Sequence, residues 1–192
     1  MPEGCEEGIR KGLYLLKPAE AKKPKANMSV QLMGSGTILN EVLYAQQMLH
    51  DDFGIHAHVW SAPSINELTR EGRKVERENL LTPGSAKTSY VHDCFAKTDG
   101  PIVCATDYMK QYSEQLRAYL PVDKTFVTLG TDGFGRSDSR EKLRRFFEVD
   151  RNFIVVAALS VLIKDGKIKQ DVLVKALSDY NISSDKLDPL YN

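Results

Sequence analysis

Eight residues form a candidate binding crevice or interface, and each follows a predicted strand. In an open parallel sheet, ligands bind beyond the carboxyl ends of the strands, where loops from neighbouring strands meet. Arg136 is the only obvious basic anchor among the eight, and a guanidinium recognises carboxylate or phosphate oxygens, so the crevice could accept a small anion. The candidate residues are Ser35, Thr37, Asp107, Tyr108, Asp132, Phe134, Arg136 and Asp138.

The segment 130–138 combines three glycines with charged side chains and one aromatic ring. Asp132 and the glycine after it are similar to the start of a magnesium–diphosphate motif, in which an Asp and, about 27 residues later, an Asn help to hold the metal. The next downstream Asn is Asn152, which is too close for that spacing. We therefore expect a structural role, in which the glycines adopt unusual backbone angles, Phe134 fills the core and Asp138 caps the next helix.

The turn 34–37 is a second candidate, because its sequence Gly-Ser-Gly-Thr places backbone N–H groups at the start of a predicted helix. Such groups can hold a phosphate. The turn lacks the third glycine of a dinucleotide-binding fingerprint, and glycines are common wherever a strand turns tightly into a helix. We favour plain turn geometry and keep phosphate binding as the alternative.

Histidine and cysteine side chains give two weaker candidates. His56 and His58 share one face of a predicted strand, whereas His92, Asp93 and Cys94 are consecutive. A metal site needs a third or fourth ligand, and no Cys-x-x-Cys or His-x-x-x-His spacing supplies one. A Cys94 nucleophile activated by His92 is equally disfavoured: in an extended segment neighbouring positions point to opposite faces, so Asp93 would lie away from both side chains. We favour a polar strand face and an ordinary loop.

These candidates depend on strands that alternate with helices. Apolar spacing predicts strands over 12–16, 29–33, 55–60, 102–105 and 125–129, and helices over 6–11, 38–49, 64–73, 108–119, 139–147, 152–164 and 170–180. Gly166 is expected to end the apolar helix before it. This alternation predicts one three-layer α/β/α domain over residues 1–192 with a mostly parallel sheet. Within it, 17–27 should be an exposed loop and 182–192 a C-terminal tail.

The composition is that of a water-soluble globular protein. The chain has 26 Lys+Arg, 26 Asp+Glu and 42% hydrophobic residues, so its formal net charge is zero and neither nucleic acid nor an anionic membrane is a default partner. The longest apolar stretch, 153–163, is too short for the ~20 residues that cross a bilayer, and the N-terminus does not resemble a signal peptide. Three cysteines without close-paired spacing fit a reducing compartment, so we expect a cytoplasmic protein.

Several segments resemble the C-terminal domain of transketolase-like thiamine enzymes. The first three are 9–16 (Ile-Arg-Lys-Gly-Leu-Tyr-Leu-Leu), 32–37 (Leu-Met-Gly-Ser-Gly-Thr) and 60–64 (Trp-Ser-Ala-Pro-Ser). Two more, 105–110 and 129–140, look specifically like the homodimeric bacterial pyruvate dehydrogenases, the decarboxylating first component of their complex. The resemblance covers nearly the whole chain. It implies a mixed five-stranded sheet in which 12–16 is the antiparallel edge strand.

The resemblance also implies a function for the longer parent enzymes. They decarboxylate pyruvate on thiamine diphosphate with magnesium and pass the acetyl group to the lipoyl domain of dihydrolipoyl acetyltransferase. Their cofactor ligands and catalytic histidines lie in two preceding domains, so the resemblance assigns no catalytic, cofactor or metal residue to this chain.

Three hypotheses follow for the chain itself. The first is a non-catalytic domain that contacts the remaining domains of its polypeptide, a second subunit of a homodimer and the acetyltransferase core. The alternative is a regulatory module that binds a small anion in the crevice. The third, a free-standing enzyme with a Cys94 nucleophile, is disfavoured by the geometry described above.

Overall fold

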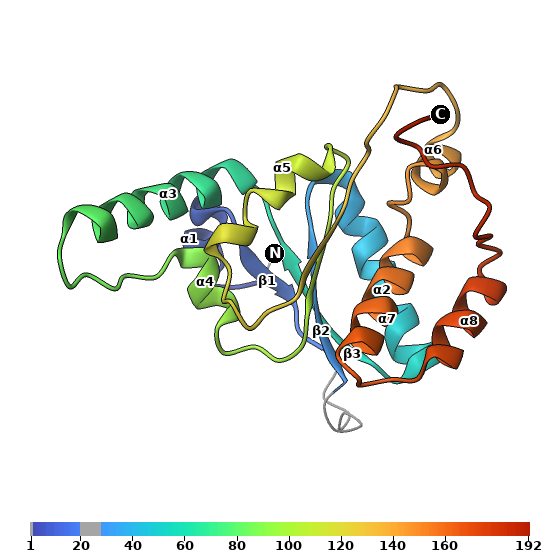
Figure 1. The fold of residues 1–192 in the computed structure, drawn as a ribbon, viewed down its shortest axis with the longest axis horizontal. Helices are drawn as coiled ribbons and strands as arrows, with labels where there is room; N and C mark the ends of the chain where they lie inside the picture. Colours follow the sequence, from blue (N-terminus) through green and yellow to red (C-terminus); the bar gives the residue numbers. More distant parts are fainter. Residues whose placement is uncertain (1, 20–27) are drawn as a thin grey trace.

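A mixed sheet of five strands lies at the centre of the structure, a computed structural model that describes residues 2–19 and 28–192 (Figure 1). The strands are β1 (Tyr14–Lys17), β2 (Ser29–Gly34), β3 (His56–Ser61), β4 (Ile102–Ala105) and β5 (Phe126–Leu129), in the order β1-β3-β2-β4-β5. Strands β2 to β5 run parallel, and β1 pairs antiparallel with β3 at one edge. The α/β fold and its antiparallel edge strand are thus confirmed.

Helices cover both faces of the sheet (Figure 1). On one face lie α2 (Leu39–Phe53) and α7 (Arg151–Lys164), with α8 (Gln170–Asp179) packed against α7. The other face carries α1 (Glu6–Lys11), α3 (Ile65–Leu81), α4 (Tyr90–Phe95) and α5 (Lys110–Glu114). The short helix α6 (Arg140–Phe146) sits beyond the carboxyl ends of the parallel strands, above α7.

Strand side chains alternate between two cores, as the period of two in a β-strand requires. Val30 and Leu32 of β2 are fully buried in the core shared with α2 and α7. Met33 is fully buried on the opposite face, in a core that contains Trp60 and Phe95, whose ring centroids are 4.9 Å apart. Both faces of the sheet are therefore covered, which gives the three predicted layers.

Helix α3 extends beyond the predicted 64–73, as far as Leu81. The sequence did not indicate its second half, because that half is largely exposed and has no apolar stripe. Ser64 caps its start, accepting a hydrogen bond from the backbone N–H of Glu67 at 3.2 Å. Near its end, Lys74 and Glu78 form an i,i+4 ion pair at 3.8 Å, and Leu80 is 81% exposed. A solvated helix with such charge pairs gives no hydrophobic periodicity.

Two other elements differ from the prediction. Residues 90–95, expected as a loop, form α4, which Ser89 caps by accepting a hydrogen bond from the backbone N–H of His92 at 3.2 Å. Val91 and Phe95 anchor this helix in the core, where both are fully buried. The predicted helix 108–119 is instead split into α5 and a 3-10 turn, Arg117–Tyr119.

The start of α6 corrects two expectations. Ser139, not Asp138, is the N-cap, and its hydroxyl accepts a hydrogen bond from the backbone N–H of Lys142. Phe134 does not fill the core, because it is 78% exposed on the preceding loop.

The end of α7 is as predicted: Gly166 adopts φ 68° and its N–H donates to the carbonyl of Ile163 at 2.9 Å.

Of the two segments expected to be irregular, 17–27 is described only in part, whereas 182–192 is described throughout. Lys17 belongs to β1, and 20–27 lie outside the described residues. Residues 182–192 contain turns but neither helix nor strand. Among the described residues, no helix is both long enough and apolar enough to cross a membrane.

Candidate functional site

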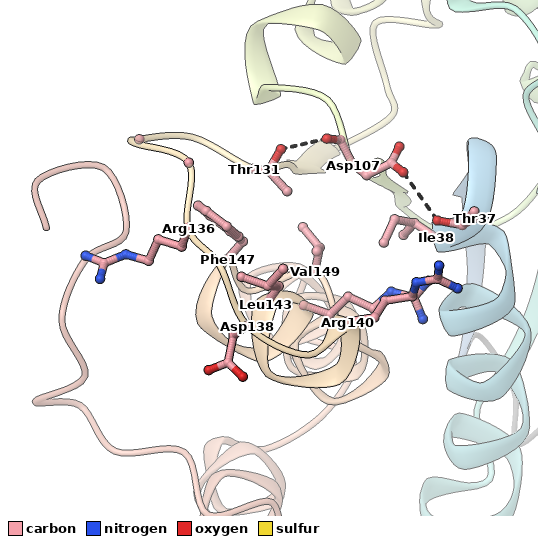
Figure 2. Close-up of a pocket in the computed structure, with 13 residues that line it drawn as sticks. Thr37, Ile38, Asp107, Thr131, Arg136, Asp138, Arg140, Leu143, Phe147 and Val149 are labelled. Carbon is pink, nitrogen blue, oxygen red and sulfur yellow. Dashed lines mark hydrogen bonds between the residues drawn. The ribbon is translucent and has the colours of Figure 1, made fainter.

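Three loops meet at the carboxyl edge of the parallel strands β2, β4 and β5. The hydroxyl of Thr37, after β2, donates to Oδ2 of Asp107, after β4, at 3.3 Å. The hydroxyl of Thr131, after β5, donates to the backbone carbonyl of Asp107 at 2.6 Å (Figure 2). Asp107 therefore connects all three strand ends, the place where ligands bind in open parallel sheets.

A cavity of about 730 Å³ opens between these loops and α6. Its volume lies within the range of about 300–1,000 Å³ that is typical of small-molecule sites. The apolar part of its lining is Ile38, Leu143, Phe147 and Val149. The remaining lining residues are Thr37, Asp107, Thr131, Gly133, Gly135, Arg136, Asp138, Arg140 and Arg144. An apolar floor with charged groups at its rim can hold a small polar molecule in one orientation.

Four of the eight predicted residues line this cavity: Thr37, Asp107, Arg136 and Asp138. Two of them turn away from it, as Figure 2 shows. The guanidinium of Arg136 lies 4.4 Å from the centroid of the Phe146 ring. Asp138 accepts a hydrogen bond from the backbone N–H of Ser139 at 2.7 Å. Only Thr37 and Asp107 of the predicted set thus face each other across the strand ends.

The other four predicted residues have different surroundings. Ser35 is buried, and its N–H donates to the carbonyl of Ala105 at 3.2 Å. Asp132 accepts a hydrogen bond from the backbone N–H of Lys110 at 3.0 Å, which holds the start of α5. Tyr108 is 58% exposed and Phe134 78% exposed, so both lie on the surface.

Sequence reasoning missed the two arginines that α6 contributes. Arg140 and Arg144 both line the cavity, and Arg140 extends from α6 in the direction of α2 (Figure 2). Positions 140, 143, 144 and 147 recur at helical spacing, so they share one face of α6. In the sequence, Leu143, Phe146 and Phe147 form an apolar stripe, which by itself predicts a core contact and not a cavity wall.

None of the residues of helix α6 is fully buried. Ion pairs and hydrogen bonds of its charged side chains hold the helix in place. Nη1 of Arg144 donates to Oε1 of Glu41 on α2 at 2.9 Å. The guanidinium of Arg145 donates to the carbonyls of Tyr180 and Asn181, which follow α8. Lys186 in the C-terminal segment donates to the carbonyl of Phe146 at 2.8 Å. The cavity wall therefore depends on ion pairs and hydrogen bonds more than on apolar burial.

Glu41 is the charged group at the centre of this arrangement, and only 4% of its surface is exposed. Burial alone would raise its pKa, but the hydrogen bonds and positive charge of Arg151, with Arg144 beside it, outweigh that effect and hold the pKa of Glu41 below its ordinary value. Nearby, burial raises the pKa of Asp150, and the N–H of Phe153 partly offsets this. The carboxylate of Glu41 is therefore charged at neutral pH.

The histidine and cysteine candidates are not brought together. In residues 2–19 and 28–192, no three His, Cys, Asp or Glu side chains converge in an arrangement that could hold a metal ion. Nδ1 of His58 instead accepts a hydrogen bond from the N–H of Ala19 at 3.2 Å. His92 and Cys94 lie on helix α4, so the extended conformation from which the sequence argument disfavoured this pair is wrong. Burial raises the pKa of the Cys94 thiol, which disfavours the nucleophilic thiolate.

The donor set does not fit thiamine diphosphate with magnesium. That pair needs convergent carboxylate or amide oxygens for the metal. Asp132, the acidic residue whose setting is similar to a magnesium–diphosphate motif, has its Oδ1 occupied by the N–H of Lys110.

The protein is a three-layer α/β/α domain with a mixed sheet and, at its strand ends, a cavity with an apolar floor and a charged rim. Residues 12–150 match the transketolase-like TK C-terminal domain, and the chain belongs to this family.

Relatives that are far longer also match the chain. It is 54% identical over 191 residues to the pyruvate dehydrogenase E1 component of Pseudomonas aeruginosa, which covers 99% of this chain and 21% of that protein. It is 48% identical over 190 residues to the E1 component of Escherichia coli K12, covering 98% of this chain and 21% of that protein. The chain thus spans about a fifth of the length of these relatives.

Solved structures support the fold alone. A transketolase from Pichia stipitis superposes with a TM-score of 0.52 at 20% identity, covering 84% of this chain and 19% of that one. The shared architecture extends over most of the chain, although the sequences have diverged widely.

Proposed function

We propose that the chain is the C-terminal domain of a pyruvate dehydrogenase E1 component and that it acts in assembly, without catalysing the reaction itself. The single observation that carries the proposal is the identity of 54% to a pyruvate dehydrogenase E1 component along 99% of this chain. The whole protein would be a cytoplasmic enzyme that uses thiamine diphosphate and magnesium bound by its other domains. It would convert pyruvate to an acetyl group and transfer this group to the lipoyl domain of dihydrolipoyl acetyltransferase.

Exposed apolar side chains support the assembly role. Tyr108 and Met109, after β4, are each 58% exposed, and Phe134, after β5, is 78% exposed. These loops follow neighbouring parallel strands, so the three side chains belong to the same edge of the sheet. Large exposed apolar groups gathered on one side are typical of protein contact sites. The partners proposed for this edge are other domains of the same polypeptide and the second subunit of a homodimer, with the acetyltransferase core as a further partner.

A chimera tests the proposal. This chain replaces the matching segment of the Pseudomonas aeruginosa E1 component, and pyruvate-dependent acetyl transfer is measured with thiamine diphosphate and magnesium. The expected result is activity close to that of the parent enzyme. A chimera that folds and reaches the parent's oligomeric state, yet is inactive, would contradict the proposal.

Two controls accompany the chimera. The corresponding segment of the Pichia stipitis transketolase, which shares the fold at 20% identity, is expected to give an inactive chimera. The present chain by itself, supplied with pyruvate, thiamine diphosphate and magnesium, is expected to release no carbon dioxide. Decarboxylation by the chain alone would overturn the non-catalytic assignment.

A further inference from the structure

We infer that the strand-end cavity binds a small organic oxyanion that carries a neighbouring hydroxyl group, with Arg140 as the principal anion-binding residue. This binding site goes beyond the assembly role and does not depend on it. It corresponds to the small-anion alternative drawn from the sequence, with Arg140 in place of Arg136 as the basic anchor.

The charge on the cavity wall is the first support. Arg140 and Arg144 are four residues apart on α6 and both line the cavity. Like charges at this spacing repel each other. Glu41 neutralises Arg144 through a contact of 2.9 Å, whereas Arg140 has no ion pair among the described residues. An oxyanion in the cavity would supply the missing countercharge, and the planar guanidinium can hold it through two parallel hydrogen bonds.

The opposite rim supplies a hydrogen-bond acceptor. Asp107 accepts the hydroxyl of Thr37 at Oδ2, and within the described residues no hydrogen bond is made to its Oδ1. Figure 2 shows Asp107 beside Thr37 at the strand ends, and Arg140 extending from α6 on the other side of the cavity. A bare anion would be repelled by the Asp107 carboxylate. A ligand that presents its anionic group to Arg140 and a hydroxyl to Asp107 satisfies both side chains.

Arg136 cannot take this role in the geometry observed. Its guanidinium lies over the Phe146 ring at 4.4 Å from the centroid and points out of the cavity (Figure 2). The cavity floor is apolar, formed by residues such as Leu143 and Phe147, which suits the carbon skeleton of an organic ligand.

Calorimetric titration of the chain tests the site with two matched ligand pairs. Malate and succinate differ by one hydroxyl, and glycerol 3-phosphate and inorganic phosphate differ by the glycerol portion with its hydroxyls. The two pairs distinguish a carboxylate from a phosphate anion. We expect saturable binding of malate or glycerol 3-phosphate, each tighter than its partner. No saturable heat from any of the four at millimolar concentration would overturn the proposal, and equal affinity within the binding pair would overturn the hydroxyl assignment.

Variants locate the binding. Arg140→Gln is expected to weaken binding by roughly 10- to 100-fold, the value of a charged hydrogen bond. Lys142→Gln, on the same helix but outside the cavity lining, is the matched control and is expected to bind as the wild type does. Because both residues are exposed, both variants should melt at the wild-type temperature. An Arg140→Gln variant with wild-type affinity would contradict the site, whatever the outcome of the chimera.

Discussion

Glu41 on α2 and Arg151 at the start of α7 are joined by three hydrogen bonds. Oε2 of Glu41 accepts the backbone N–H of Arg151 at 3.1 Å and its Nε at 2.9 Å, and Oε1 accepts Nη2 at 3.2 Å. The Arg151 guanidinium also lies 3.8 Å from the centroid of the Tyr44 ring. Since Arg144 reaches the same carboxylate, one buried negative charge connects α2, α6 and α7.

Glu41→Gln is therefore expected to destabilise the fold by about 3 kcal/mol, because it leaves two arginines without their buried countercharge. The corresponding loss of melting temperature is roughly 6–12 °C for a chain of this size. Glu67→Gln is the matched control: its ion pair with Arg70 is exposed, so its loss should cost about 0–1 kcal/mol. Thermal unfolding followed by circular dichroism measures both, and equal melting temperatures for the two variants would contradict the role of Glu41.

Stability should fall in acid partly through Glu41. Its pKa is lower in the folded state than in the unfolded chain, so its contribution is complete above the unfolded value of about 4.3 and is lost as the pH falls through the folded-state pKa. Asp150 acts in the opposite direction, because burial raises its pKa. Between about pH 5 and pH 3, the melting temperature of Glu41→Gln should decline less steeply than that of the wild type. If the two melting temperatures declined in parallel, the pKa of Glu41 would be the same in the folded and the unfolded chain.

Phe134→Ala should leave stability within about 0.5 kcal/mol of the wild type, since the ring is exposed. Phe95→Ala is the matched comparison: the same change at a fully buried ring that packs on Trp60 should cost about 3–5 kcal/mol. Urea denaturation of both variants measures the difference. A large loss for Phe134→Ala would mean that the ring is buried in solution.

Two glycines of one loop should respond in opposite ways to alanine. Gly133 has φ 99°, and a Cβ there would lie 2.0 Å from the carbonyl oxygen of Pro189, so Gly133→Ala should cost more than about 1 kcal/mol. No atom of the described residues lies within 4 Å of a Cβ on Gly135, so Gly135→Ala should be neutral or stabilise by up to about 1 kcal/mol. Denaturation midpoints measure both. A neutral Gly133→Ala would show that the C-terminal segment does not press against this loop.

The fold could be predicted because its buried strands are short apolar runs in the sequence. The predicted strand 102–105 has the bounds of β4, and residues such as Val103 and Cys104 are buried on opposite faces of the sheet. The elements that were missed depend on other forces. Helix α4 rests on the Ser89 cap and two apolar anchors, Val91 and Phe95, which are too few to establish a periodicity. The second half of α3 is solvated and shows no stripe.

Only part of the candidate site could be predicted from the sequence. The rule that loops meet at the carboxyl ends of parallel strands located Thr37 and Asp107, which the structure brings into contact. The roles of the arginines required tertiary contacts. Arg136 stacks on Phe146, whereas Arg144 meets Glu41 more than a hundred residues away in the chain. Contacts between residues so far apart in the chain produce no pattern in the local spacing of residue types.

The way α6 is fastened makes it sensitive to dissolved salt. Ions shorten the reach of charge–charge attraction, to a Debye length of about 8 Å at 0.15 M and about 3 Å at 1 M, while the apolar packing of the sheet and its two cores is not weakened in this way. Concentrated salt should therefore weaken the partly exposed contact of Lys186 with Glu148 before the buried contact of Arg144 with Glu41, and loosen the cavity wall from the side of the C-terminal segment. The cavity would then change shape with ionic strength in a protein that otherwise keeps its fold.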